Sequence, residues 1–346
     1  MPTKGWRKVR PGDPTDPEGF RQRLAQFVAW MEAVQYAAPT IRMRLLQLEP
    51  FIEWCDARGL TKPTQLTRAL LERYQRHVSL YRTAAGTPLA LQSQQHRLTS
   101  VRVFCKWLTR QHLLLHNPAA ELQLPRMGRP LPKAILSEAD VEQVLRHCDV
   151  TTPIGLRDRA ILETLYSTGI RRTELLGLAL TDLDRDRGLL RVRHGKGRTE
   201  RYVQIGERAL AWLDKYLIEV RPQWVSDPTT DALFVLHTGR QMTPTQLSAR
   251  VRFALQQSGL GKPGACHLFR HSCATAMLEH GADLRSIQEL LGHATLATTQ
   301  LYTRISIRHL KDVHQRTHPT AQLTRRTSEP PDDDEPAALD AEEVRP

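Results

Sequence analysis

Residues 168–175 of the chain read TGIRRTEL, which places two arginines just after a glycine that ends a predicted helix. The apolar pattern of residues 158–168 is typical of an α-helix, and Gly169 offers the left-handed conformation in which helices commonly end. Arg171 therefore lies at a break between helices, where functional side chains occur more often than in helix interiors. The stretch predicts a helical scaffold that presents an arginine at its edge.

A short β-hairpin is predicted after this helical region. Two β-like runs, residues 189–193 and 201–205, flank an HGKG sequence, so Lys196 lies near the tip of the turn. Residues 233–236 resemble one further strand, and the pattern after them is helical again. The fold class expected from these patterns is mainly α with a small β-sheet.

Four amphipathic helices are predicted ahead of this region. Their apolar residues recur at steps of three and four, in segments near 24–31, 41–52, 70–81 and 101–108. No single helix can bury its apolar stripe alone, so the four are expected to pack as a small bundle. The fourth helix carries three basic residues on one face: Arg102, Lys106 and Arg110. That face is either an ordinary solvated surface or a face that follows DNA phosphates.

The composition between the two helical regions indicates a linker. Residues 117–132 hold four prolines together with the basic residues Arg126 and Arg129, which are further candidates for DNA contact. The chain is therefore expected to divide into five parts: a flexible basic arm (1–18), a helical domain (19–116), a linker (117–134), a second domain (135–317) and an acidic, disordered tail (318–346).

The charge of the chain favours a polyanionic partner. Its 49 Lys and Arg against 37 Asp and Glu give a net charge of +12. Residues 327–346 hold eight acids and one base, which leaves 48 bases and 29 acids, or +19, in residues 1–326. A surplus of this size is typical of proteins that bind nucleic acid.

The cysteines and the apolar content place the protein in a reducing, aqueous compartment. The five cysteines form no CxxC pair and no even framework, so they are expected to be free thiols. No apolar run approaches the roughly 18 residues that a membrane span requires, and nothing resembles a signal peptide. We expect a cytoplasmic protein, associated with the nucleoid in a bacterium-like cell, with no membrane partner.

Five short segments of the second domain carry side chains suited to phosphate chemistry. They are TGIRRTEL (168–175), HGKG (194–197), HLFRH (267–271), LGH (291–293) and TTQLY (298–302). Each alone is a common pattern with an ordinary structural explanation, but the conjunction in this order is specific.

Together these segments resemble the tyrosine recombinase (phage-integrase) family, most closely its bacterial Xer-type members. The resemblance in motifs spans roughly residues 137–303, and the N-terminal helices fit the family by layout only. It implies a SAM-like helical core-binding bundle followed by a mixed α+β catalytic domain, closing as a clamp around duplex DNA.

The resemblance also assigns six catalytic positions: the phosphate-clamping arginines Arg171 and Arg270, the hairpin lysine Lys196, the active-site histidines His267 and His293, and the nucleophile Tyr302. Glu174 matches a supporting acid found near the first arginine in many members. No cofactor and no metal are expected. The partners implied are a double-stranded DNA recombination site and other protomers, in a homotetramer on synapsed DNA or a heterotetramer with a paralogue, which exchange strands through a Holliday junction.

These residue types suit the reaction independently of the family. Arginine forks match the non-bridging oxygens of a phosphodiester, on which negative charge grows during attack by a hydroxyl. A tyrosine, with a pKa near 10, attacks poorly unless its proton is taken up, and a histidine titrates in the range needed to accept it. A lysine at a hairpin tip is a plausible acid for the leaving 5′-oxygen.

Three other interpretations fit parts of the sequence. Cys266 and Cys273 lie near His267 and His271, which raises a zinc site, but the segment holds no HExxH or CxxC pattern. A type IB topoisomerase would use the same chemistry with strand rotation. A catalytically silent DNA-binding or architectural protein would keep the fold without the reaction.

Overall fold

The structure is a computed structural model that describes residues 12–126, 128, 134–193 and 200–292. The chain forms two compact units, Met1–Arg129 and Pro130–Pro346, and each is described by itself. The finer division predicted from the sequence stays a prediction, because most of the predicted arm and the whole predicted tail lie outside the described residues. In the described part, no helix is long and apolar enough to cross a membrane.

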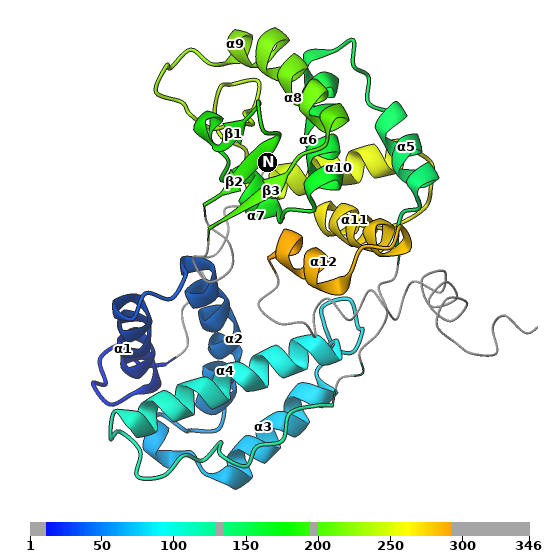
Figure 1. The fold of residues 1–346 in the computed structure, drawn as a ribbon. Helices are drawn as coiled ribbons and strands as arrows, with labels where there is room; N and C mark the ends of the chain where they lie inside the picture. Colours follow the sequence, from blue (N-terminus) through cyan, green and yellow to red (C-terminus); the bar gives the residue numbers. More distant parts are fainter. Residues whose placement is uncertain (1–11, 127, 129–133, 194–199, 293–346) are drawn as a thin grey trace, which may run out of the picture. The chain divides into compact units, whose positions relative to one another are not determined.

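The first unit is a bundle of the predicted kind (Figure 1). Its described helices are α1 (Phe20–Ala33), α2 (Ala38–Asp56), α3 (Arg68–Leu80) and α4 (Leu91–Arg110), with a 3₁₀ turn, η1 (Pro63–Gln65), between α2 and α3. The ring of Phe27 on α1 lies 5.4 Å from that of Phe104 and 5.3 Å from that of Trp107, both on α4. Aromatic packing of this kind joins the helices through the apolar faces that the sequence pattern indicated.

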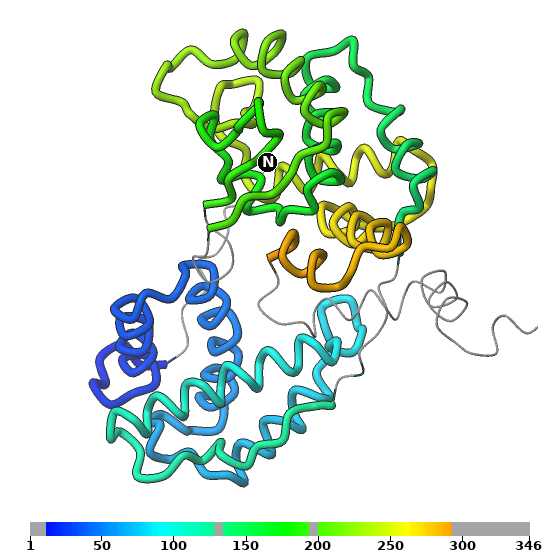
Figure 2. Tube along the Cα trace, viewed as in Figure 1, coloured from blue at the N-terminus to red at the C-terminus, as the bar shows by residue number. Residues whose placement is uncertain are grey.

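The second unit is mainly helical, with a small sheet. Its described elements are α5 (Glu138–Arg146), α6 (Pro153–Thr168), α7 (Arg172–Leu176), η2 (Leu180–Asp182), β1 (Leu183–Asp184), β2 (Leu189–Val192), β3 (Arg201–Gln204), α8 (Glu207–Glu219), α9 (Arg221–Trp224), α10 (Pro244–Gln257), α11 (Cys266–Glu279) and α12 (Leu284–Leu291). The path of the chain through both units can be followed in Figure 2. The fold class predicted from the sequence, mainly α with a small β-sheet, is confirmed.

The three strands form one antiparallel sheet in the order β1-β2-β3. Leu190 pairs with Val203 and Val192 with Arg201, so the predicted hairpin is confirmed. The predicted strand at 233–236 is wrong: Val235 makes only an isolated bridge to Gln241. A tight turn explains the difference, because Leu236 N donates to the carbonyl of Arg240 four residues later and reverses the chain before a ladder can extend.

Helix α6 is the central element of the second unit and packs against α8 and α11. It begins earlier than the apolar pattern predicts, because the side chain of Thr152 caps its first turn and Pro153 occupies the first position. It ends at Gly169, which has a φ of +58°. A side chain there would clash with Leu291, since an added Cβ would lie 2.8 Å from Leu291 Cδ2. The glycine therefore allows the end of α6 to meet the end of α12.

Candidate active site

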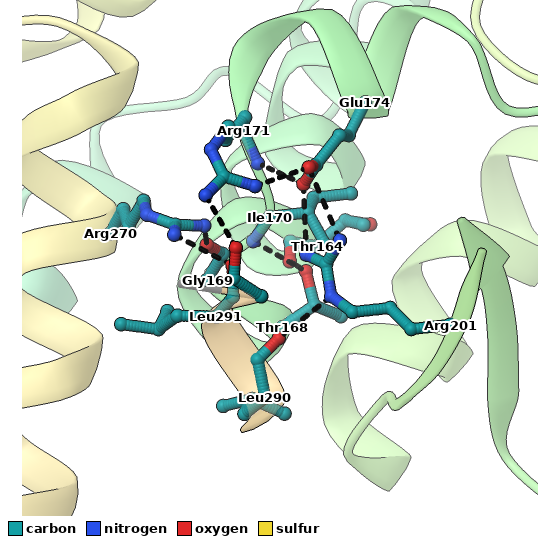
Figure 3. A network of polar contacts seen from close by, with 11 residues as sticks. Thr164, Thr168, Gly169, Ile170, Arg171, Glu174, Arg201, Arg270, Leu290 and Leu291 are labelled. Carbon is teal, nitrogen blue, oxygen red and sulfur yellow. Dashed lines mark hydrogen bonds and ion pairs between the residues drawn. The ribbon is translucent and has the colours of Figure 1, made fainter. Parts of the chain in front are cut away.

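A buried carboxylate, that of Glu174, is the centre of a polar network in the second unit (Figure 3). Arg171 donates to it from its backbone N at 2.8 Å and from Nη1 at 2.6 Å. Arg201 donates to the same carboxylate from Nη1 at 3.2 Å and from Nη2 at 2.9 Å. Charge-assisted bonds of this kind fix the orientation of both guanidinium groups.

The C-terminal end of α12 is held by three arginines. Arg201 Nε donates to the carbonyl of Leu290 at 3.1 Å, and Arg270 Nη2 donates to that of Leu291 at 2.7 Å. Arg171 Nη2 donates to the carbonyl of Gly292 at 2.8 Å. The last carbonyls of a helix have no partner within the helix and carry its negative dipole end, so cations are favourable there. The three guanidinium groups are thereby brought to one place.

Arg270 comes to this place from α11 and is only 4% exposed. Its Nη1 donates to the carbonyl of Gly169 at 2.6 Å, which ties it to the end of α6. Figure 3 shows Arg171 and Arg270 converging on the end of α12 from different elements. Contacts to the ends of α6 and α12 therefore place the two predicted clamping arginines side by side.

His267 lies one helical turn before Arg270 on α11, as the HLFRH spacing predicts. The residue is exposed as a whole. Partial desolvation, and then the charges of Arg270, Arg172 and Arg171, lowers the pKa of His267 below its ordinary value. The histidine is therefore neutral at pH 7, the form that can accept a proton.

His271 and the neighbouring cysteines belong to the packing of α11. Desolvation first, and then His267 and Arg270, lowers the pKa of His271. Burial raises the pKa of the Cys273 thiol to about 12, so this group is a neutral thiol at pH 7. Across the described part of the chain, no three His, Cys, Asp or Glu residues are placed to hold a metal ion.

The structure brings together four of the seven residues predicted for this site, namely Arg171, Glu174, His267 and Arg270. The other three, Lys196, His293 and Tyr302, lie outside the described residues. The roles assigned to all seven stay predictions.

Arg201 was missed by sequence reasoning, although the sequence holds a signal for it. It shares a face of β3 with the buried Val203, because strand side chains alternate between the two faces. An arginine on the inward face of a strand predicts a buried anionic partner, since a buried charge is costly without one.

The candidate DNA-contact residues lie on the first unit. Lys106 and Arg110 are exposed on α4 and Arg102 is half-buried there, while Arg126 is exposed beyond the helix. Arg129 lies outside the described residues. Exposure is what phosphate contact requires, but it does not assign the role, which stays a prediction.

Comparisons with known proteins identify relatives of the chain. The model of the "Phage integrase family" matches residues 134–309. The chain is 51% identical to "Tyrosine recombinase XerC 2" of Ralstonia nicotianae, over 84% of this chain and 83% of that protein. It is 40% identical to "Tyrosine recombinase XerD" of Pseudomonas aeruginosa, over 79% of this chain and 88% of that protein.

Two solved structures share the fold. The XerH site-specific recombinase bound to palindromic difH substrate matches with a TM-score of 0.65 at 22% identity, over 84% of this chain and 83% of that one. The Tn1549 transposon integrase in complex with circular intermediate DNA matches with a TM-score of 0.65 at 16% identity, over 85% and 98%. At these identities the likeness concerns the fold alone.

Proposed function

Because the chain belongs to the phage integrase family and is an Xer-like tyrosine recombinase, we propose that it cleaves and rejoins DNA strands at a specific site through a covalent bond between Tyr302 and a 3′-phosphate. The observation that carries this proposal is the convergence of Arg171 and Arg270 at the end of α12. The two residues are brought together from segments about a hundred positions apart in the sequence.

The formal charge of the site at the end of α12 suits the binding of a phosphodiester. Three arginines and one glutamate, namely Arg171, Arg201, Arg270 and Glu174, give a formal charge of +2. A guanidinium carries five N–H donors, so Arg171 can hold Glu174 and still donate to a phosphate oxygen. Donors fixed in advance stabilise the charge that develops on the non-bridging oxygens in the transition state.

The proposed reaction balances without a cofactor. The Tyr302 hydroxyl attacks the phosphorus, a 3′-phosphotyrosyl bond forms, and the bond to the 5′-oxygen breaks. A histidine takes the tyrosine proton, and Lys196 gives a proton to the leaving 5′-oxygen. His267 suits the first task in its protonation state, since its lowered pKa keeps it neutral at pH 7. A free 5′-hydroxyl from another strand then reverses the step, and no divalent metal takes part.

The proposed partner is duplex DNA carrying a recombination site. The similar XerH and Tn1549 structures hold DNA, and the surplus of basic residues in this chain favours the same ligand. Strand exchange between two sites requires four active sites, so we propose a tetramer of this chain, alone or with a paralogue, that passes through a Holliday junction. Binding should weaken steeply with salt, because phosphate neutralisation releases counterions.

A covalent-trapping experiment tests the proposal. Wild type and Tyr302→Phe are incubated in EDTA with nicked suicide duplexes tiled across the DNA that flanks the native gene, and SDS-resistant adducts are scored and sequenced. The expected result is adducts from wild type alone, which also identifies the target duplex. Adducts from both proteins would show that Tyr302 is not the nucleophile. DNA binding by both proteins without any adduct would indicate a catalytically silent binder.

A further inference from the structure

We infer that Arg201 is a positioning residue of this active site, which orients Arg171 through Glu174 and fixes the end of α12, from which the chain continues to His293. The inference rests on the proposed function. Arg201 lies outside all five segments that carry the family resemblance. Its place follows from contacts between β3, α7 and α12.

The three guanidinium nitrogens of Arg201 each have a protein acceptor. Nη1 and Nη2 donate to the two carboxylate oxygens of Glu174, and Nε donates to the carbonyl of Leu290. The side chain is 15% exposed and that of Glu174 is 1% exposed. A guanidinium in which every nitrogen is directed at protein is placed to hold other groups. Among the described residues, the guanidinium of Arg171 bonds Glu174 and the carbonyl of Gly292 through its two Nη groups.

The backbone of Arg201 is itself fixed by the sheet. Arg201 is the first residue of β3 and pairs with Val192 of β2, whose side chain is buried. Its side chain thus starts from a rigid strand and bridges to two other elements. Sites built on strands and helices are held more closely than sites on loops.

The last turn of α12 packs directly against this guanidinium. Gly292 ends the helix with a φ of +62°, and a Cβ added there would lie 2.9 Å from Arg201 Cζ and 3.0 Å from Nε. The glycine is therefore required by the backbone conformation and by the approach of Arg201. The same residue gives its carbonyl to Arg171, so one short segment contacts both arginines.

The ionisation of Glu174 agrees with this arrangement. Burial alone would raise the pKa of this carboxyl, but hydrogen bonds from Arg201 and then from Arg171 hold it below its ordinary value. Of the contributions that keep Glu174 charged, the hydrogen bond from Arg201 is the largest. A charged Glu174 is what directs the fork of Arg171.

The test compares Arg201→Ala and Arg201→Lys with a matched control, Arg208→Ala. Arg208 lies on α8, outside the site, and also bonds a buried carboxylate, that of Glu163. Arg159 is the second arginine that bonds Glu163. Single-turnover adduct formation and DNA affinity are measured on the trapped duplex. For Arg201→Ala we expect a rate loss of roughly 10- to 100-fold, the scale for groups that orient active-site ligands, with DNA affinity nearly unchanged. Arg201→Lys should recover part of the rate, because an ammonium keeps the charge but cannot reach three acceptors at once.

The inference is overturned if Arg201→Ala cleaves DNA as fast as Arg208→Ala, or if its affinity falls by the same factor as its rate. Hydrogen exchange in residues 284–292 supplies a readout that does not depend on cleavage. We expect these amides to exchange faster in Arg201→Ala than in wild type and Arg208→Ala, and equal exchange in all three would also overturn the inference. If wild type itself forms no adduct, the proposed function fails. The exchange result alone then decides whether Arg201 fixes the end of α12.

Discussion

Two buried glutamates of the second unit are each held by two arginines, and they differ in what else surrounds them. Glu174 is bonded by Arg171 and Arg201. Glu163 on α6 is bonded by Arg159 at 2.8 Å and by Arg208 at 3.0 Å. Both carboxylate side chains are 1% exposed. The local chemistry of the two ion-pair clusters is therefore nearly the same.

The difference lies in the charge balance. Around Glu163, Arg208 also pairs with Glu142, so two arginines meet two glutamates and the formal charge is zero. Glu174 is paired with two arginines, and a third, Arg270, does not contact the carboxylate but bonds the same helix end, which brings the total at this site to +2. A charge-balanced cluster can hold the scaffold together, whereas an unbalanced one costs stability until an anion arrives. The two clusters therefore differ in formal charge, although their central carboxylates are equally buried.

The largest difference between the two clusters should appear in the rate of DNA cleavage. Arg270→Ala removes a preorganised donor from the phosphate and should lower the rate of adduct formation by about 10²–10³-fold. Arg159→Ala removes an arginine from the balanced cluster and should leave the rate of the folded protein unchanged. Single-turnover cleavage by both variants checks this, and equal losses would remove the distinction between the two clusters.

Removing the carboxylates should affect stability. Glu174→Gln leaves two largely buried arginines, Arg171 and Arg201, without their carboxylate partner, whereas Glu163→Gln leaves one, Arg159, because Arg208 is half-exposed and keeps Glu142. Each substitution should cost about 3 kcal/mol of unfolding free energy, the scale for breaking a buried ion pair. Glu174→Gln leaves three arginines together, so sulfate should restore more of its stability than that of Glu163→Gln. Urea unfolding in sodium sulfate and in sodium chloride of equal ionic strength measures this, and equal recovery would argue against an anion site.

Lowering the pH should destabilise the folded protein in part by protonating Glu174 in the unbalanced cluster. Its pKa is lowered in the folded protein, so its contribution to stability is complete above the unfolded value of 4.5 and is lost as pH falls through the lower folded value. Unfolding free energies from pH 3 to 6 should therefore fall less steeply in Glu174→Gln than in wild type. Parallel curves for the two proteins would contradict the assignment.

The smallest effect is expected at the rim of the balanced cluster. The side chain of Arg208 is 49% exposed. When this side chain is removed, Glu163 keeps its ion pair with Arg159. Arg208→Ala should cost less than about 1 kcal/mol, because half-exposed ion pairs are screened by solvent. Thermal unfolding measures this cost, and a larger loss would mean that Arg208 is part of the structural core.

Sequence reasoning worked where the signal was local. Gly169 was predicted to end a helix from its position after an apolar pattern, and it has a positive φ. The HLFRH segment places His267 and Arg270 three positions apart in a region predicted to be helical, and both lie on α11.

It failed where the contact was long-range. Arg201 meets Glu174 across 27 positions and Leu290 across 89, and no periodicity in the sequence encodes such a pairing. The strand expected at 233–236 failed for a related reason, since β-like residues form a strand only where a partner continues alongside them.

The surplus positive charge at Glu174 should act on the negative charge of the scissile phosphate. The most direct measurement compares cleavage of the trapped duplex with cleavage of the same duplex carrying an uncharged methylphosphonate at the scissile position, for wild type, Arg270→Ala and Arg159→Ala. The defect of Arg270→Ala should shrink strongly on the uncharged duplex, because no phosphate charge is left to stabilise, while Arg159→Ala should follow wild type on both. A defect of the same size on the two duplexes would contradict it.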